Sequence, residues 1–401
     1  MQIAPLAPTG RLERNSPMTA ATLEILDRLI AFPTVSSASN RDLIAFAAEF
    51  LATRGIEASL TPNAEGSKAN LFATIGPKDR GGVMLSGHTD VVPVEGQAWS
   101  GDPFRLRDLD GRLTGRGAAD MKGFLACALA AADRAAGMAL ATPLHLAFSY
   151  DEEIGCIGVR SLLEAMAGAP FRPEMAIVGE PTSMRIATGH KGKTALRALC
   201  CGREAHSALA PTALNAIHLA TAFVDKIRAR QAAFANEGAR DGAYDVPYTT
   251  LHVGRIAGGV ALNIVPNTCS LEFEFRNLAE DDPAALLACL EADAEAVAAP
   301  WRKAFPEAAV KLEVTNAYPG LATEENEPVV GFVQSLTSRN DRLKVAFGTE
   351  GGLFRARLSI PTVVCGPGSM DQGHKPDEWL SRDQLAECDR FMDALLGRLA
   401  A

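Results

Sequence analysis

The first two segments of the chain show the spacing of amphipathic helices. Over 19–32, apolar residues recur every three or four positions on one face, and Pro33 ends the pattern. The residues of that face are Leu23, Leu26 and Ile30. A second helical pattern covers 41–53. We therefore expect two helices ahead of the first strongly apolar run.

Short apolar runs, each followed by a polar turn that contains or adjoins glycine, come next. These runs are VMLS at 83–86, LHLAFS at 144–149 and MAIVG at 175–179. Between the first two lies a helical pattern, 122–137, which ends at Gly137. Strands that alternate with helices predict an α/β fold with a mainly parallel sheet.

The pattern changes after about residue 188. Apolar and polar residues now alternate along the predicted strands. The elements follow in the order strand 193–202, helix 215–232, strands 248–258 and 269–277, helix 283–298 and strand 310–318. This β-α-β-β-α-β order predicts a compact α+β unit of the ferredoxin-like kind. The α/β pattern resumes near 327, with strands at 343–348 and 361–366 and a last helix from 381.

We therefore expect a discontinuous main domain, 1–187 and 317–401, interrupted by an inserted domain, 188–316. The segment 1–17 is predicted to be a loose arm, and Met18 is an alternative start of the chain.

Composition narrows the function classes. The chain has 401 residues, 47% of them apolar and 22% charged, which suits a globular protein of two domains. A formal net charge of −9 argues against nucleic acid as a partner. No run approaches the roughly 18 apolar residues of a membrane span, and Arg11 and Arg14 precede no apolar signal segment. Eight scattered cysteines without a CxxC pair indicate reduced thiols, so we expect a cytoplasmic protein without a membrane partner.

Two glycine-rich segments fall short of nucleotide-binding motifs. GRGAAD at 115–120 has Asp120 where a dinucleotide-binding fingerprint needs its third glycine. HKGKT at 190–194 ends like a phosphate-binding loop, but Ala187 occupies the position of its first glycine. These departures argue against nucleotide binding.

Histidine and carboxylate residues follow the predicted strands instead. His88 and Asp90 come after the strand at 83–86, and Asp120 stands between glycines at the start of a helix. A ligating histidine needs an acceptor for its second nitrogen, which Asp90 could provide. The alternatives are a surface histidine in a turn and an Asp that only caps the helix.

Three consecutive acids, Asp151, Glu152 and Glu153, follow the strand at 144–149, and Glu180-Pro181 follows the strand at 175–179. Adjacent carboxylates repel one another unless they are solvated or neutralised by cations. One could bind a metal while its neighbour acts as a general base. The alternative is an exposed acidic turn at either place.

His374 lies in a long loop rich in Gly and Pro after the strand at 361–366. It completes a set of two histidines and three carboxylates at strand ends or in glycine-rich loops. In an open α/β sheet, such positions face the crevice where ligands bind. The set suits two divalent ions that share one bridging carboxylate.

The motifs HTDVVPV, GRGAADMKGF, YDEEIG, GEPT and DQGHKPDE together resemble the M20 metallopeptidase family, which includes acetylornithine deacetylases, desuccinylases, carboxypeptidases and aminoacylases. The resemblance implies a zinc-hydrolase catalytic domain and an inserted dimerisation or lid domain. It also implies two zinc ions, one held by His88 and Glu180, the other by Glu153 and His374, with Asp120 as the bridge. Glu152 would be the general base, Asp90 would orient His88, and the peptide bond after Asp120 would be cis. Cobalt or manganese also fits such ligands.

Three residues of the insert extend the resemblance. His206, in REAHS, resembles a histidine that reaches the active site of the partner subunit, which implies a homodimer with His206 as an oxyanion donor. Asn263 and Arg276 resemble positions that bind the substrate α-carboxylate, a task suited to Arg. The alternatives are a surface histidine and a solvent-facing arginine.

The loop FGTEGG at 347–352 resembles acetylornithine deacetylases more than desuccinylases. It implies removal of acetyl from N2-acetyl-L-ornithine, a small N-acyl amino acid, within arginine biosynthesis. Gly348 and Glu350 are the candidates for substrate binding there, with Glu350 accepting the cationic side chain. A desuccinylase, a broad N-acyl-amino-acid hydrolase and a glutamate-releasing carboxypeptidase remain the alternatives, as does a non-catalytic protein on this fold.

Overall fold

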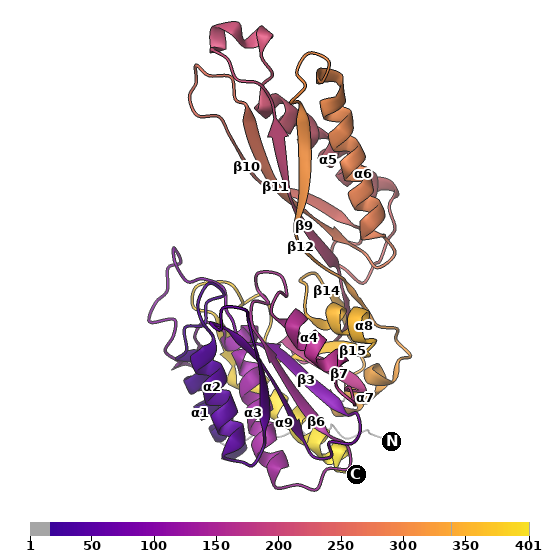
Figure 1. The fold of residues 1–401 in the computed structure, drawn as a ribbon. Coiled ribbons are helices and arrows are strands. Elements are labelled where there is room, and N and C mark those ends of the chain that lie inside the picture. The colour runs from indigo at the N-terminus through magenta and orange to yellow at the C-terminus, as the bar shows by residue number, and fades with distance from the viewer. Residues whose placement is uncertain (1–16, 338, 401) are drawn as a thin grey trace, which may run out of the picture.

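The computed structural model describes residues 17–337 and 339–400. Helix α1 (Pro17–Ile30) opens this part of the chain, and the arm predicted ahead of it lies outside the described residues. Two bodies follow, one above the other in Figure 1. The lower is built on a large sheet, and the upper, residues 192–318, is called the inserted unit below. The exact domain boundaries stay a prediction.

The large sheet has nine strands in the order β1-β2-β6-β3-β7-β15-β8-β13, with β14 beside β8. The four central strands, β6, β3, β7 and β15, run parallel, whereas β1 and β2 are antiparallel at one edge. The bounds are β1 (Ala58–Pro62), β2 (Ala69–Ile75), β3 (Val83–His88), β6 (Leu144–Ser149), β7 (Met175–Pro181), β8 (Ile186–His190), β13 (Leu321–Ala322), β14 (Arg342–Val345) and β15 (Thr362–Gly366). The predicted, mainly parallel α/β sheet is confirmed.

Helices cover both faces of this sheet (Figure 1), and alternate residues of each strand face opposite layers. On β3, Leu85 packs in one apolar core and Met84 in the other. One layer consists of α1, α2 (Arg41–Ala52), α3 (Gly123–Ala136), α7 (Pro328–Thr337) and α9 (Arg382–Leu399), and the opposite layer of α4 (Val159–Ala167) and α8 (Gly351–Leu358). Because both faces are covered, all residues of β3 and β6 are buried, which explains their unbroken apolar runs.

A small three-stranded sheet, β4 (Arg107–Leu109), β5 (Arg112–Thr114) and β16 (Trp379–Ser381), lies beside the large one. It joins two distant parts of the chain, because β16 pairs with β5. A π-helical turn, Ala118–Lys122, follows β5 and leads into α3. The loop that contains Asp120 and the loop that contains His374 are thereby brought together.

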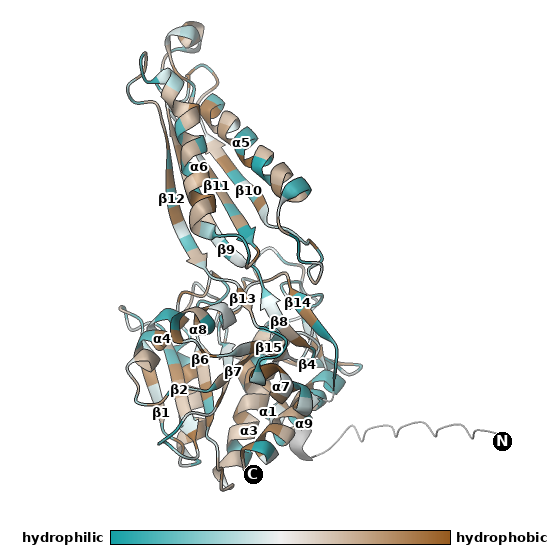
Figure 2. Ribbon diagram, turned by 90° about the vertical axis from the view of Figure 1, so that its right-hand side faces the viewer, coloured by the Kyte–Doolittle hydropathy of each residue, from teal (hydrophilic) through white to brown (hydrophobic). Residues whose placement is uncertain are grey.

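The inserted unit has the predicted β-α-β-β-α-β order. Its elements are β9 (Gly192–Cys201), a 3-10 turn (Ser207–Thr212), α5 (Ala216–Glu237), β10 (Thr250–Gly258), β11 (Thr268–Asn277), α6 (Pro283–Ala298), a second 3-10 turn (Ala299–Trp301) and β12 (Ala309–Tyr318). The antiparallel sheet has the order β10-β11-β9-β12, and both helices pack on one face of it (Figure 2). Alternate residues of β9 and β11 are buried against these helices, as the alternating pattern predicts.

Two further observations concern the described residues as a whole. None of their helices combines the length and the apolar character needed to cross a lipid bilayer. All eight cysteines are free thiols, and six of them are buried, as expected from their scattered spacing.

Candidate metal centre and active site

The parallel strands place three groups of side chains at one edge of the large sheet. His88 is the last residue of β3, Glu180 lies at the end of β7, and Glu152 and Glu153 follow β6. Since β6, β3 and β7 are neighbours, their carboxyl ends meet. Asp120 reaches the same place from the π-helical turn, whose Asp120–Met121 peptide bond is cis, as the resemblance implies.

Asp120 is contacted by one histidine at each carboxylate oxygen. His88 Nε2 lies 3.0 Å from Asp120 Oδ1, and His374 Nε2 lies 3.1 Å from Asp120 Oδ2. Two further carboxylates complete the two halves of the cluster. Glu180 Oε1 lies 3.6 Å from His88 Nε2, and Glu153 Oε2 lies 3.0 Å from His374 Nε2. This pairing is the arrangement expected of a carboxylate shared by two cations.

The donor atoms fit a metal ion. Ligand atoms of His88, Asp120 and Glu153 all lie within 4.8 Å of one another, and so do those of His88, Glu152 and Glu180. Imidazole nitrogens and carboxylate oxygens are ligands that Zn²⁺ and similar divalent ions accept. The chain therefore holds side chains that could bind divalent ions, and all five predicted ligands lie in this cluster.

Burial makes the charges in the cluster strongly dependent on one another. Burial, together with the Asp120 charge, raises the pKa of Glu153 to about 7, and the same causes raise the pKa of Glu180 well above its usual value. Burial opposes the charged form of His88, but Glu180, Asp120 and Asp90 raise its pKa well above the ordinary value. Several buried carboxylates so close together are stabilised by nearby positive charge, which the two imidazoles supply here.

One side of the cluster opens to solvent. The His88 side chain is 1% exposed and that of Glu180 is 4% exposed, whereas 43% of the His374 side chain is exposed. His374 also has a positive φ of 60°, which L residues rarely adopt and which is frequent at functional sites. A substrate would therefore approach past His374.

Glu152 lies beside the cluster. Burial and the charges of Glu153 and Glu350, opposed by His88, raise the pKa of Glu152 to about 8. The buried thiol of Cys156 donates a hydrogen bond to Glu152 Oε1, with a Sγ–Oε1 distance of 3.2 Å. Sequence reasoning missed Cys156, because a single cysteine after a glycine carries no signal of its own.

Asp90 contacts His88 differently from the prediction. His88 Nδ1 lies 2.9 Å from the backbone oxygen of Asp90, whereas the nearest carboxylate oxygen, Oδ1, is 3.6 Å away. A carbonyl oxygen can only accept, so Nδ1 keeps its proton in either charge state of the ring. In the charged imidazole Nε2 donates toward Asp120 Oδ1, and a metal ion would replace that second proton on Nε2. The Asp90 carboxylate instead accepts hydrogen bonds from Glu152 N at 3.1 Å, Glu153 N at 3.3 Å and Ser36 Oγ at 2.7 Å.

Arg276 lies at the end of the inserted sheet that is nearer the cluster. Its Nε donates to Glu274 Oε1 at 2.8 Å, and its Nη1 donates to Tyr318 Oη at 3.3 Å. Tyr318 in turn covers Gly348, where an added Cβ would lie only 2.1 Å from the phenol oxygen. Arg276 and Gly348, both predicted to bind substrate, are thus connected through Tyr318, which the sequence did not single out.

Glu350 is enclosed rather than open to a substrate. Its side chain is 1% exposed, Ser86 Oγ donates to its Oε2 at 3.2 Å, and burial raises its pKa to about 7. The prediction that Glu350 receives a cationic substrate side chain finds no open surface in this structure. Glu350 is the N-cap of α8, and the packing of this helix against β15, β13 and β7 explains why the residue is buried.

His206 and Asn263 lie together, but far from the cluster. Ser207 N donates to Asn263 O at 2.9 Å, and both predicted residues are exposed. His206 follows Cys201 and Asn263 precedes Thr268, so both lie beyond the Cys201–Thr268 end of the β9–β11 pair, whereas Arg276 pairs with Lys193 at its other end. At about 3.3 Å per residue, the eight steps along β9 separate the two ends by about 26 Å. Within one chain these two residues therefore do not reach the cluster.

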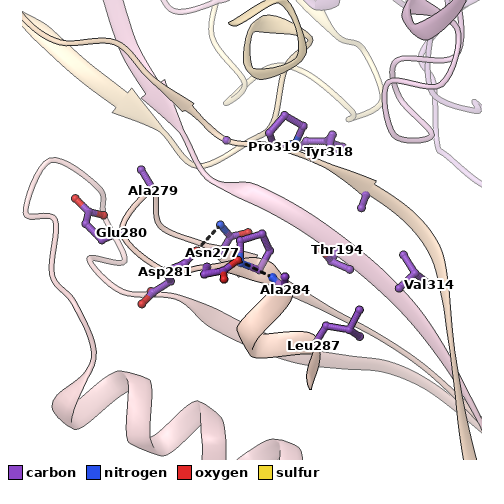
Figure 3. Close-up of a pocket in the computed structure, with 14 residues that line it drawn as sticks. Thr194, Asn277, Ala279, Glu280, Asp281, Ala284, Leu287, Val314, Tyr318 and Pro319 are labelled. Atoms are coloured by element: carbon purple, nitrogen blue, oxygen red, sulfur yellow. Dashed lines mark hydrogen bonds between the residues drawn. The ribbon is translucent and has the colours of Figure 1, made fainter. Parts of the chain in front are cut away.

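A cavity of about 690 Å³ lies where the inserted unit joins the main body (Figure 3). Leu287 and Val314 line one wall, and Tyr318 and Pro319 line another. Three acidic residues, Glu280, Asp281 and Asp282, also line the cavity. One of them already has a partner, because Asp282 Oδ1 accepts a hydrogen bond from Ala284 N at 2.9 Å. None of the metal-binding candidates lines this cavity, so it belongs to the junction rather than to the cluster.

Comparisons with known proteins show what the chain is similar to. The sequence profile of peptidase family M20/M25/M40 matches residues 84–398. An acetylornithine deacetylase of Pasteurella multocida (strain Pm70) is 33% identical over 387 residues, which cover 94% of this chain and 97% of that protein.

Solved structures share the fold at lower identity. An M20 family metallo-carboxypeptidase from Sulfolobus solfataricus superposes with a TM-score of 0.75 at 18% identity, covering 94% of this chain and 99% of that one. A dinuclear metal-binding peptidase of the M20 family from Bacillus subtilis superposes with a TM-score of 0.66 at 15% identity, covering 96% and 99%.

Proposed function

Because the chain belongs to the M20/M25/M40 peptidase family and is an amidohydrolase of that family, we propose that it removes the acetyl group of N2-acetyl-L-ornithine, giving L-ornithine and acetate. The observation that carries the hydrolytic chemistry is the convergence of two histidines on the two oxygens of Asp120, with Glu152 beside them. The likeness to the Pasteurella deacetylase supports the choice of substrate.

We assign His88 and Glu180 to one divalent ion, Glu153 and His374 to a second, and Asp120 to both, with zinc as the resident metal and cobalt as a substitute. When bound, such ions supply Lewis-acid polarisation of the amide carbonyl and lower the pKa of water. The backbone oxygen of Asp90 keeps the proton of His88 on Nδ1, so that Nε2 faces the cation.

Glu152 is proposed as the general base. Its carboxylate takes a proton from the attacking water and returns that proton to the leaving amine. In the metal-free chain burial raises the pKa of Glu152 to about 8, and bound cations would lower it toward the range in which a carboxylate accepts a proton from water. The Cys156 thiol holds the side chain of Glu152, and the hydrogen bond that Glu152 N donates to the Asp90 carboxylate holds its backbone.

Arg276 is proposed to bind the α-carboxylate of the substrate, since a guanidinium pairs well with a carboxylate. Its bond to Tyr318 leaves part of the guanidinium free, and 28% of the side chain is exposed. Because His206 and Asn263 lie far from the cluster of their own chain, we propose that they complete the site of a partner subunit in a homodimer. His206 would then donate to the developing oxyanion.

The test is acetate release from N2-acetyl-L-ornithine by zinc-loaded protein, compared with succinyl-diaminopimelate and with neutral acetyl-amino acids. We expect the highest kcat/KM for acetyl-ornithine and loss of hydrolysis in Glu152→Ala. Hydrolysis of only the succinylated or neutral compounds would overturn the substrate and retain the amidohydrolase. Because Glu350 is enclosed, Glu350→Gln tests whether preference for a basic side chain depends on it; an unchanged preference would remove that role.

A further inference from the structure

A buried ion pair lies directly behind Asp120, and none of the roles proposed above uses it. Arg116 Nη1 donates to Glu378 Oε2 at 2.7 Å, and both side chains are only 1% exposed. The other oxygen of Glu378, Oε1, accepts two backbone hydrogen bonds at 3.0 Å each, from Ala119 N and from Asp120 N. Every contact of this carboxylate therefore involves the segment 116–120.

The same carboxylate belongs to the chain segment that carries His374. Glu378 follows His374 by four residues and precedes β16. Its backbone oxygen accepts a hydrogen bond from Gly115 N at 2.9 Å, and β16 continues the pairing with β5. Glu378 thus joins the loop of Asp120 to the loop of His374 through both its backbone and its side chain.

Arg116 is itself fixed by several groups. Its Nη2 donates to Gln97 Oε1, and its guanidinium lies over the Trp99 ring, 5.0 Å from the centroid. Enclosing an arginine and a glutamate costs desolvation, which their attraction only partly offsets, so such a pair is a poor source of stability by itself. A geometric role explains why the pair occupies this position.

We propose that Glu378, held by Arg116, is a positioning residue that fixes the backbone of Asp120, and through it the two carboxylate oxygens between His88 and His374. This inference rests on the proposed two-metal function. The hydrogen bonds of the Glu378 side chain go to Arg116 and to the backbone of Ala119 and Asp120, so its carboxylate acts on the Asp120 segment rather than on the donor atoms. Displacing Asp120 weakens its contacts to both halves of the cluster together, because its two oxygens face different histidines.

The test is Co²⁺ binding to metal-free protein, measured by titration calorimetry and by the d–d absorption of the bound ion. Glu378→Gln has nearly the same shape, but its amide group cannot accept hydrogen bonds at both ends. We expect Co²⁺ affinity to fall about 10- to 100-fold, as for other residues that orient metal ligands, with an altered absorption spectrum. The matched control is Asp389→Asn, which changes a 1% exposed carboxylate of α9 bonded by Thr22.

The outcomes separate this inference from the proposed function. If the unmodified chain fails to bind two Co²⁺ per chain, the two-metal function itself fails. If that chain binds two but Glu378→Gln binds them with the same affinity and spectrum, the positioning role is wrong. Equal losses in Glu378→Gln and Asp389→Asn would also overturn it, because they would indicate general destabilisation. If Glu378→Gln does not fold, Arg116→Lys is the alternative variant, because it removes the guanidinium that holds Glu378. We expect Arg116→Lys to lower the affinity for Co²⁺ as well. An unchanged Co²⁺ affinity in this variant would refute the proposal.

Discussion

Removing divalent ions from this chain should make its stability fall as the pH rises from 5 to 8. The cluster contains buried acids whose ionised forms are unfavourable without a cation. Burial and neighbouring negative charge raise the pKa of Glu153 from 4.5 to about 7 and that of Glu152 from 4.5 to about 8. In the unfolded chain both carboxyls ionise near their ordinary values.

The sign follows from the number of bound protons. Between pH 4.5 and 8, Glu152 and Glu153 bind more protons in the folded metal-free chain than in the unfolded chain, so their contribution to the free energy of unfolding decreases as the pH rises. Burial lowers the pKa of His145 and of His190 to about 4, and these two histidines, which lie outside the cluster, contribute in the opposite direction equally with and without metal. At about 1.4 kcal/mol per pH unit, Glu153 alone lowers it by about 2 to 3 kcal/mol between pH 5 and 8. Glu152 and Glu153 each contribute to the rise of the other, so their effects overlap, and we expect about 4 kcal/mol in total.

His374 acts in the same direction at higher pH. Hydrogen bonds to Asp120 and Glu153 raise its pKa to about 10, so the stability that its charge provides is complete below pH 6.5 and is lost as the pH rises through 10. A net stability of about 5 to 15 kcal/mol is typical of a folded protein. A loss of about 4 kcal/mol is therefore a large part of the total.

The assay is urea unfolding of chelator-treated protein at pH 5, 6, 7 and 8 and constant ionic strength, repeated with excess zinc. Zinc should raise the free energy of unfolding most at pH 8, because it binds the ionised acids of the folded state. Asp389→Asn is the control, since burial raises the pKa of Asp389 to about 6 without any contact to the cluster. This substitution should change the pH dependence of the free energy of unfolding by the same amount with and without zinc. A zinc-dependent increase in the free energy of unfolding that is no larger at pH 8 than at pH 5 would refute the reasoning.

Four further predictions concern catalysis. Glu152→Gln should lower kcat by about 10²- to 10⁴-fold, the usual contribution of a general base, with metal content by elemental analysis unchanged; retained activity would exclude Glu152 as the base. Cys156→Ala removes the hydrogen bond from the thiol to Glu152, worth about 1 kcal/mol, so kcat should fall about fivefold. The kcat of Cys156→Ser should stay closer to that of the unmodified chain. Equal kcat values in the two variants and the unmodified chain would show that the thiol does not position the base. Gly348→Ala should raise KM more than it lowers kcat, because its Cβ displaces Tyr318, which hydrogen-bonds the Arg276 guanidinium that we propose binds the substrate; an unchanged KM would contradict this. Mixing inactive Glu152→Gln and His206→Ala chains should restore about a quarter of the activity in a dimer that shares residues as proposed, and subunit exchange without any recovery would count against sharing.

Much of the fold could be predicted from the pattern of apolar residues. The unbroken apolar runs of β3 and β6 reflect burial on both sheet faces, and the alternation in β9 and β11 reflects burial on one face. The edge strand β1 and the short β4 were missed, because five and three residues with little burial leave no periodic signal.

The candidate ligands could also be predicted, since each follows a strand or stands in a glycine-rich loop. The order of strands then brings them together, because parallel neighbours end at the same edge. The contact between His88 and the backbone oxygen of Asp90 could not be predicted. It depends on the turn after β3, which directs the Asp90 carboxylate toward the backbone of Glu152 and Glu153.

The order of residues alone is thus enough to predict which chemical groups are available: two imidazoles, three carboxylates and a neighbouring acid, on elements whose apolar pattern predicts where they end. Folding settles which oxygen faces which histidine, that Cys156 holds Glu152, that Glu350 is enclosed and that His206 lies away from its own cluster. The physical reason is that apolar periodicity is a local property of the chain. Contacts among buried polar atoms depend on how distant segments pack, and a shift of about one ångström there makes or removes a hydrogen bond.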